Sequence, residues 1–212
     1  MDLYFAPLAC SLSARIAAYE ANAAIQFHQV DNKLKRVLDG SADYLAINPQ
    51  GQVPVLKLDS GELLTENPAV LQAIADAHPK SGLVPAAGIE RLRVQQWLNF
   101  VTSELHKFVF IALLDDKAPE GAKQYARDKA VPRFDYLNKH LTGRGFLLDR
   151  FTIADAYLVT ILNWAAPSGI DLAKWPTVAS YYRRMHARPA IAKAFAEELA
   201  LYREEQARQK AA

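Results

Sequence analysis

The chain has 212 residues, of which 51% are hydrophobic and 23% are charged, and its formal net charge is +2. This composition is typical of a soluble globular protein, and the charge is too low and too evenly spread for a nucleic-acid stripe or a polybasic membrane segment. Cys10 is the only cysteine, which excludes an internal disulfide and suits a reducing compartment. The Met1-Asp2 start and Pro7 do not fit a secretory signal, and no apolar run approaches the ~18 residues of a membrane span. We therefore expect a cytoplasmic protein with no nucleic-acid or membrane partner.

The N-terminal part of the chain alternates between strand-like and helix-like segments. Short apolar runs predict four strands, at residues 3–5, 26–30, 55–58 and 62–65, and the turn Asp59-Ser60-Gly61 predicts that the last two form a hairpin. Helical spacing predicts helices at residues 13–23 and 68–77. This order predicts a mixed four-stranded sheet with helices packed on its faces, which is an α/β domain.

The rest of the chain reads as helical. Residues 79–88, rich in Pro, Gly and small side chains, predict a linker between a domain at 1–78 and a domain at 89–212. Long helices are expected at 89–113 and at 119–141, the second bent at Pro132, and further helices after Pro176 and Pro189. Thr152 and Asp155 have the spacing of a capping box at the start of another helix. The fold class is therefore α/β followed by all-α.

Cys10 lies between the first strand and the first helix, and two interpretations of it are open. A free cysteine is often a small buried hydrophobic residue. A thiol at the start of a helix, with Ser11 or Ser13 capping that helix, is instead exposed to unpaired N–H groups and the helix dipole, which favour a sulfur anion. The position favours the second interpretation.

Two further stretches predict ligand contacts. A cis bond between Val53 and Pro54 would leave the Val53 backbone free to pair with a peptide-like ligand, although many strands simply begin with Pro. Glu66 and Asn67 precede a helix that begins at Pro68, and Asn67 can serve as its N-cap. The alternative role for this pair is to receive the amine and the carboxylate of a ligand.

The helix expected at 89–113 has two neighbouring faces. Its apolar face comprises Leu98, Val101, Leu105, Phe108 and Ala112, and its polar stripe comprises Asn99, Ser103 and His106. A polar stripe alone usually faces solvent. No two of the five histidines have metal-ligand spacing, so we expect no metal site.

Five motifs together resemble the cytosolic glutathione transferases, and most closely the bacterial beta class: "APLACSLS", "INPQGQVPVL", "LLTEN", "WLNFVTSELHK" and "FTIADAYL". The resemblance covers both domains. It implies a thioredoxin-like N-terminal domain that binds glutathione as co-substrate, an all-helical C-terminal domain that forms the second-substrate site, and a homodimer. Phe5 departs from the family, in which tyrosine is common at this position.

The resemblance also implies roles for individual residues. Cys10 and His106 would be catalytic, with Cys10 approaching the glutathione sulfur and forming a mixed disulfide with it. Asn99 and Glu104 would lie where the partner subunit reaches into the site. The full set implied to bind glutathione is Cys10, Ser11, Lys35, Gln52, Val53, Pro54, Glu66, Asn67, Asn99, Ser103, Glu104, His106 and Lys107.

The activity implied is conjugation of reduced glutathione to a hydrophobic electrophile, as in detoxification. Two alternatives remain open at this point. One is a glutathione-dependent thiol-disulfide oxidoreductase, which would work through one thiol because the chain lacks a resolving cysteine. The other is a non-catalytic protein that binds hydrophobic ligands on the same scaffold.

Overall fold

The computed structural model describes residues 1–40 and 42–211, and the chain divides into two compact units. The first comprises Met1–Leu83 together with Pro189–Ala212, and the second comprises Val84–Arg188. The domain boundaries predicted from sequence place the C-terminal helix with the helical domain, whereas its packing places it in the first unit.

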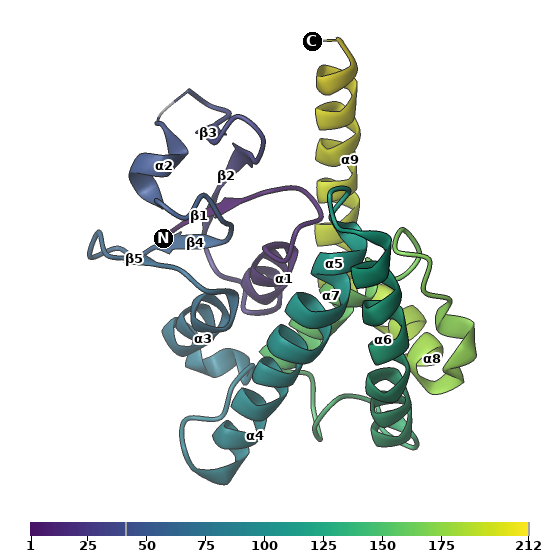
Figure 1. The fold of residues 1–212 in the computed structure, drawn as a ribbon. Coiled ribbons are helices and arrows are strands. Elements are labelled where there is room, and N and C mark those ends of the chain that lie inside the picture. The colour runs from purple at the N-terminus through teal and green to yellow at the C-terminus, as the bar shows by residue number, and fades with distance from the viewer. Residues whose placement is uncertain (41, 212) are drawn as a thin grey trace. The chain divides into compact units, whose positions relative to one another are not determined.

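The first unit is built on a mixed five-stranded sheet (Figure 1). Its strands are β1 (Asp2–Phe5), β2 (Gln26–Asp31), β3 (Arg36–Val37), β4 (Val55–Lys57) and β5 (Leu63–Leu64), in the order β3-β2-β1-β4-β5. β1 pairs in parallel with β2, and the other pairings are antiparallel. The four predicted strands are confirmed, but the prediction of only four is wrong because β3 adds a fifth. β3 has two residues, too few for a pattern to show in the sequence, and it is not preceded by a glycine-containing turn like the one that marks the equally short β5.

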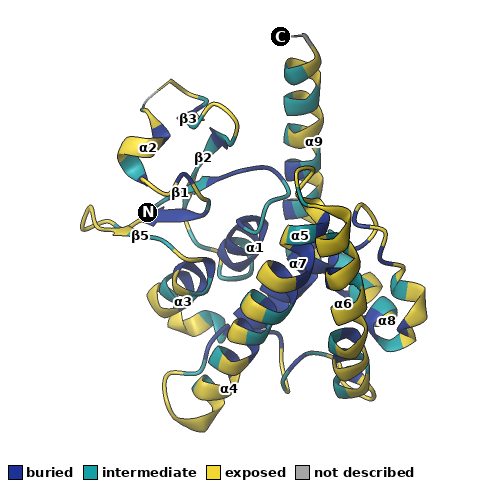
Figure 2. Ribbon diagram, viewed as in Figure 1, coloured by how far each residue is buried: buried dark blue, intermediate teal, exposed yellow. Residues whose placement is uncertain are grey.

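Alternation along β1 sends its side chains to the two faces of the sheet. Tyr4 packs on the face covered by α2 (Tyr44–Ile47), beside a buried cluster of Val30, Val37, Tyr44 and Val55. Phe5 lies on the opposite face, where the Arg15 guanidinium of α1 (Leu12–Glu20) stacks 4.4 Å from its ring centre. The side chains of α1 are buried almost all round, because α3 (Asn67–Ala77) and α9 (Pro189–Ala211) also pack against it (Figure 2).

The second unit is helical. It contains α4 (Gly88–Asn99), a π-helix η2 (Phe100–Phe110), α5 (Ile111–Leu114), α6 (Glu120–Leu141), α7 (Ile153–Leu162) and α8 (Pro176–His186). Short 3-10 turns occur at η1 (Pro79–Ser81), in the first unit, and at η3 (Leu172–Lys174). All ten residues of α7 are buried (Figure 2), so this helix forms the core of the unit. The helix predicted at 119–141 is confirmed as α6, which continues through Pro132.

The helix predicted at 89–113 is present but is not α-helical throughout, and the faces assigned to it are partly wrong. Hydrogen bonds from i to i+5 widen each turn of η2, so a spacing of three and four residues no longer follows one face. Phe108 is 38% exposed, whereas Val109 and Phe110 are fully buried in its place. His106, predicted on the polar stripe, is buried. Sequence periodicity could not reveal this change in the buried face, because a spacing of three and four residues assumes an α-helix.

The continuous helical segment Gly88–Leu114 is also long and apolar enough to cross a membrane, with a mean hydropathy of 1.2 in its most apolar window. This differs from the expectation that no apolar run approaches such a length. Core helices of soluble proteins pass the same test, and this segment packs against α6 and α7 within its unit.

Candidate functional site

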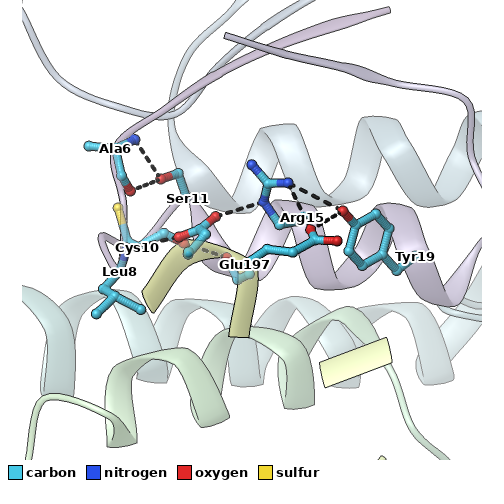
Figure 3. Close-up of polar contacts among 9 residues, drawn as sticks. Ala6, Leu8, Cys10, Ser11, Arg15, Tyr19 and Glu197 are labelled. Atoms are coloured by element: carbon cyan, nitrogen blue, oxygen red, sulfur yellow. Dashed lines mark hydrogen bonds and ion pairs between the residues drawn. The ribbon is translucent and has the colours of Figure 1, made fainter. Parts of the chain in front are cut away.

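The Cys10 loop connects the end of β1 to the start of α1, and a hydroxyl and a carboxylate hold it in place. The Ser11 hydroxyl accepts from the backbone N–H of Ala6 at 3.2 Å and donates to the Ala6 carbonyl at 3.1 Å, as Figure 3 shows. Ser11 occupies the N-cap position of α1 but makes no side-chain cap, and the Ser13 hydroxyl donates to the Cys10 carbonyl at 2.7 Å. The prediction that one of these serines caps the helix with its side chain is therefore wrong. Both instead fix the loop that carries the thiol.

A buried ion pair supports the same loop from the C-terminal helix. The Glu198 carboxylate accepts from the Leu8 backbone N–H at 2.8 Å and from the Arg15 Nε at 2.9 Å, and Glu198 and Arg15 are both buried. Leu8 has a φ of +59°, a conformation that non-glycine residues adopt only when their surroundings hold them there. Burial raises the pKa of Glu198 to about 7, while the Arg15 guanidinium and the Leu8 N–H act in the opposite direction.

The guanidinium of Arg15 makes further contacts along α1 (Figure 3). It donates to the Tyr19 hydroxyl at 3.2 Å and to the Glu197 carboxylate at 3.3 Å, and it stacks 3.9 Å from the centre of the Phe27 ring. Sequence reasoning missed this cluster, because Glu197 and Glu198 look like part of a charged, solvated tail. Arg15, a charged residue in the middle of the mostly apolar α1, was the available signal.

The thiol faces a second loop, which leads into β4. The Cys10 Sγ donates to the Val53 carbonyl at 3.3 Å, and the thiol is of intermediate exposure, so Cys10 is not a buried core residue. The predicted cis bond between Val53 and Pro54 is confirmed. Within residues 1–40 and 42–211, the backbone N–H of Val53 has no hydrogen-bond partner. A half-exposed thiol therefore lies beside a free main-chain donor.

Lys35 and Gln52 lie at the same loop. The Lys35 ammonium donates to the Gly51 carbonyl at 2.8 Å, and the Gln52 side chain is exposed. Gly51 has a φ of +63°, and a Cβ there would lie 3.2 Å from the Cδ and Cε of Lys35. Glycine at this position thus lets the lysine side chain cross the loop backbone. The structure brings Lys35, Gln52, Val53 and Cys10 together in the first unit, as the resemblance implied.

Glu66 and Asn67 differ from the sequence expectation. α3 begins at Asn67 with Glu66 at the N-cap position, so the prediction that Asn67 caps a helix starting at Pro68 is wrong. The Asn67 side chain is buried and donates to the Ser13 hydroxyl at 2.9 Å. Glu66 is exposed and has a φ of +64°. Its carboxylate is accessible to a ligand amine.

The remaining predicted site residues lie in the second unit. His106 is 5% exposed, its Nδ1 lies 2.6 Å from the Tyr157 hydroxyl, and the Trp164 ring packs edge-on at 5.0 Å between ring centres. Burial, with a smaller contribution from the charge of Lys107, lowers the pKa of His106 to about 4. His106 is therefore neutral at physiological pH. Tyr157, its hydroxyl partner, was missed because nothing in the sequence links two residues 51 positions apart.

The polar residues near His106 make local contacts. Asn99 and Ser103 are exposed and donate to helix carbonyls of Gln95 and Asn99, respectively. The Glu104 carboxylate pairs with the Arg133 guanidinium at 2.5 Å, and Lys107 is exposed. The roles of these residues and of His106 toward a ligand stay predictions from the resemblance.

In the part of the chain that the structure describes, no three His, Cys, Asp or Glu side chains are grouped so that they could hold a metal ion. The polar groups at Cys10 and Val53 are a thiol, a main-chain carbonyl and a main-chain N–H. They suit a peptide-like ligand that carries sulfur.

Comparison with known proteins identifies the class that this fold and site define. Residues 9–77 match the family "Glutathione S-transferase, N-terminal domain", and residues 100–189 match "Glutathione S-transferase, C-terminal domain". The chain is 38% identical over 200 residues to the glutathione S-transferase GstA of Escherichia coli O157:H7, a match that covers 93% of this chain and 98% of that one.

Solved structures agree. A sphingomonad glutathione S-transferase complexed with glutathione superposes with a TM-score of 0.89 at 40% identity, covering 93% of this chain and 98% of the other. The bacterial beta-class enzyme of Sphingomonas chungbukensis superposes equally well, with a TM-score of 0.89 at 38% identity and the same coverage. The chain therefore belongs to the glutathione S-transferase family, and the resemblance drawn from its motifs is confirmed.

Proposed function

We propose that this glutathione S-transferase conjugates reduced glutathione to hydrophobic electrophiles, and that Cys10 forms a mixed disulfide with glutathione by exchange with oxidised glutathione. The observation that supports this most directly is the half-exposed Cys10 thiol, 3.3 Å from the Val53 carbonyl and close to the free Val53 N–H. Glutathione is a peptide with one thiol. Its cysteinyl backbone can pair with Val53 as an added strand would, which lays its sulfur near Cys10.

Charged groups extend the proposed contacts to the two ends of the tripeptide. Glu66 is exposed and would receive the γ-glutamyl amine, while Lys35, which lies across the Gly51 backbone, would meet the glycine carboxylate. A charge-assisted hydrogen bond at each end fixes both position and direction of the ligand. Gln52 and Pro54 flank the paired residue. Ser11 acts through the loop, because its hydroxyl is occupied by the Ala6 backbone.

In the conjugation step, the sulfur of glutathione attacks the electrophilic carbon as a thiolate. A carbon–sulfur bond forms, and the leaving group departs with the electron pair of the bond it breaks. We propose that His106, neutral at physiological pH, acts near the sulfur as a hydrogen-bond partner and not as a cation. The helical second unit would supply the surface for the electrophile, and Asn99, Ser103, Glu104 and Lys107 would complete the glutathione site across a homodimer. We place the enzyme in the cytoplasm, where reduced glutathione and a lone thiol are both stable.

The thiol-disulfide oxidoreductase is kept as the second candidate, because the single thiol is accessible. In that reaction the Cys10 thiolate attacks the glutathione sulfur of a mixed disulfide between glutathione and another thiol. That disulfide breaks, Cys10 becomes bonded to glutathione, and the other thiol leaves as a thiolate that takes up a proton. The sulfur of reduced glutathione then attacks the Cys10–glutathione bond, which frees Cys10 and forms oxidised glutathione. The non-catalytic alternative is set aside because the family is enzymatic.

One panel of assays distinguishes the two reactions. The wild-type enzyme and Cys10→Ala are compared with glutathione plus aryl halides, epoxides and unsaturated carbonyls, and with glutathione plus a mixed disulfide. We expect Cys10→Ala to lose disulfide exchange while it retains part of the conjugation activity. Equal loss of both activities would make Cys10 the nucleophile throughout and would favour the oxidoreductase. Light scattering at micromolar concentration tests the homodimer, and a monomer would remove the roles given to Asn99 and Glu104.

A further inference from the structure

The loop that faces Cys10 is held through three consecutive backbone carbonyls. Lys35 donates to the carbonyl of Gly51, and Cys10 donates to that of Val53. Between them, the carbonyl of Gln52 accepts from the Tyr44 hydroxyl at 2.7 Å and from the Asn48 side-chain amide at 2.8 Å. Gln52 thus has two donors from protein side chains, which use both lone pairs of its oxygen.

The two donors on Gln52 are themselves fixed. Tyr44 is fully buried in the cluster with Val30, and Asn48 is 3% exposed. The Asn48 backbone N–H donates to the Tyr44 carbonyl at 2.8 Å, and its side-chain oxygen accepts from the Gln50 N–H at 3.1 Å. Because both donors are buried and Asn48 is fixed by these bonds, they hold the Gln52 carbonyl in one orientation.

That orientation also determines the direction of the Val53 N–H. The Gln52 carbonyl and the Val53 N–H belong to one peptide unit, which is planar, so a trans bond points them in opposite directions. The cis bond of this loop is the next one along the chain, between Val53 and Pro54. Tyr44 and Asn48 therefore aim the Val53 N–H away from themselves and toward the side on which it has no partner.

We propose that Tyr44 and Asn48 are positioning residues for glutathione, which hold the Gln52 carbonyl so that the Val53 N–H is pre-aimed at the main chain of the bound tripeptide. The proposal rests on the proposed glutathione site at Val53. A donor that is already oriented costs less ordering on binding, so the pair contributes to affinity without touching the ligand. Loss of one of the two donors leaves the Gln52–Val53 peptide free to tilt.

The test is Tyr44→Phe, which keeps the buried ring and removes only the hydroxyl. Tyr19→Phe is the matched control, since it removes a tyrosine hydroxyl in the same unit that bonds to Arg15 and Glu197 and not to this loop. Calorimetric titration with reduced glutathione gives the Kd, and steady-state kinetics separate KM from kcat. We expect Tyr44→Phe to raise the Kd and the KM for glutathione about threefold to tenfold, the range for one hydrogen bond, with kcat unchanged. We expect no change of Kd in Tyr19→Phe.

A second measurement does not depend on the ligand. In the glutathione-free protein, the ¹³C carbonyl resonance of Gln52 and the ¹⁵N resonance of Val53 are expected to shift in Tyr44→Phe and to stay in place in Tyr19→Phe. If both resonances are unmoved, or if the two variants lose the same affinity, the positioning role is wrong. If wild-type protein does not bind glutathione while the resonances shift as expected, the proposed function fails and the aiming of Val53 stands.

Discussion

The Glu198 carboxylate accepts the backbone N–H of Leu8, a residue 190 positions earlier in the chain, at 2.8 Å. Through this bond the C-terminal helix supports the loop of the only cysteine. The same carboxylate binds the buried Arg15, so its loss leaves that guanidinium with only the partly exposed Glu197 carboxylate as a counter-charge. A contact of this kind is sensitive to removal of either partner.

We expect Glu198→Ala to lower the free energy of unfolding by about 3–5 kcal/mol, the range for breaking a buried ion pair on one side. Glu197→Ala is the matched control. Glu197 contacts the same guanidinium, but its side chain is 39% exposed, so we expect a loss of no more than about 1 kcal/mol. Urea unfolding of the two variants measures both values. Equal losses would show that Glu198 is no more important than its exposed neighbour.

The capping box predicted at Thr152 is present, but Asp155 does more than cap a helix. Its fully buried carboxylate accepts from the Thr152 N–H at 2.9 Å, from the Leu147 N–H at 2.8 Å and from the Tyr181 hydroxyl at 2.9 Å. A cap alone is worth about 1 kcal/mol and at most about 2. Asp155→Ala would also strand the buried donors of Leu147 and Tyr181, each at about 1–3 kcal/mol.

We therefore expect Asp155→Ala to lose more than about 3 kcal/mol of stability, beyond the cost of a cap. Thr152→Ala, which removes the hydroxyl but leaves the bonds of Asp155 to Leu147 and Tyr181, is expected to lose about 1 kcal/mol. Chemical denaturation gives both values, and glutathione affinity per folded molecule is expected to stay unchanged. A selective loss of affinity at normal stability would contradict this assignment.

The pH dependence of stability provides a test of His106. Burial lowers its pKa from 6.5 to about 4 in the folded protein, so the unfolded chain binds the proton first as the pH falls. Its contribution to stability is present above pH 6.5 and is lost as the pH falls toward 4. The loss amounts to at most about 3 kcal/mol, because one unit of pKa corresponds to 1.36 kcal/mol.

We expect this part of the acid destabilisation to be absent from His106→Gln. The measurement is the free energy of unfolding at several pH values between 4 and 7 for both proteins, and the difference between them isolates His106 from His186, whose pKa is also lowered by burial. An NMR titration in which the His106 imidazole protonates near pH 6.5 in the folded state would overturn the prediction.

Local patterns in the sequence predicted most of the fold. The apolar runs of the strands, the turn at Gly61, the capping box and the Val53-Pro54 motif all act over a few residues, and each is present in the structure. β3 was missed because two residues carry no period and no glycine-containing turn precedes it, whereas the two-residue β5 follows the turn at Gly61. The faces of the helix at 89–113 were misassigned because the π-helix changes the period itself.

The site was predictable only in part, because local patterns reveal the residues of a motif and not the residues that support them from elsewhere in the chain. Cys10 and Val53 were proposed from their motifs and Lys35 from the resemblance, and the structure brings these three candidates together. The residues that hold them could not be found in this way. Tyr44 acts on a backbone carbonyl, which any sequence supplies, and Glu198 acts across nearly the whole length of the chain. Such contacts depend on the three-dimensional fold and leave no local pattern.

Cys10 is expected to carry one glutathione after treatment with the oxidised form. The thiol is partly exposed and donates to the Val53 carbonyl, and α1 begins two residues after it, so the sulfur lies near the positive end of the helix dipole. Intact-mass analysis of the native protein is expected to show an adduct of one glutathione, removed by a reductant and absent from Cys10→Ala.

Reduced glutathione is expected to protect Cys10 from an alkylating probe, because the bound sulfur occupies the same space. It is also expected to raise the Tm, since a ligand that binds only the folded state adds to its stability. Cys10→Ala is expected to keep part of that rise in Tm, because Val53, Glu66 and Lys35 are unchanged. If neither oxidised glutathione nor the alkylating probe modifies the thiol of the native protein, the Cys10 sulfur is inaccessible beside Val53. The glutathione sulfur would then need another partner.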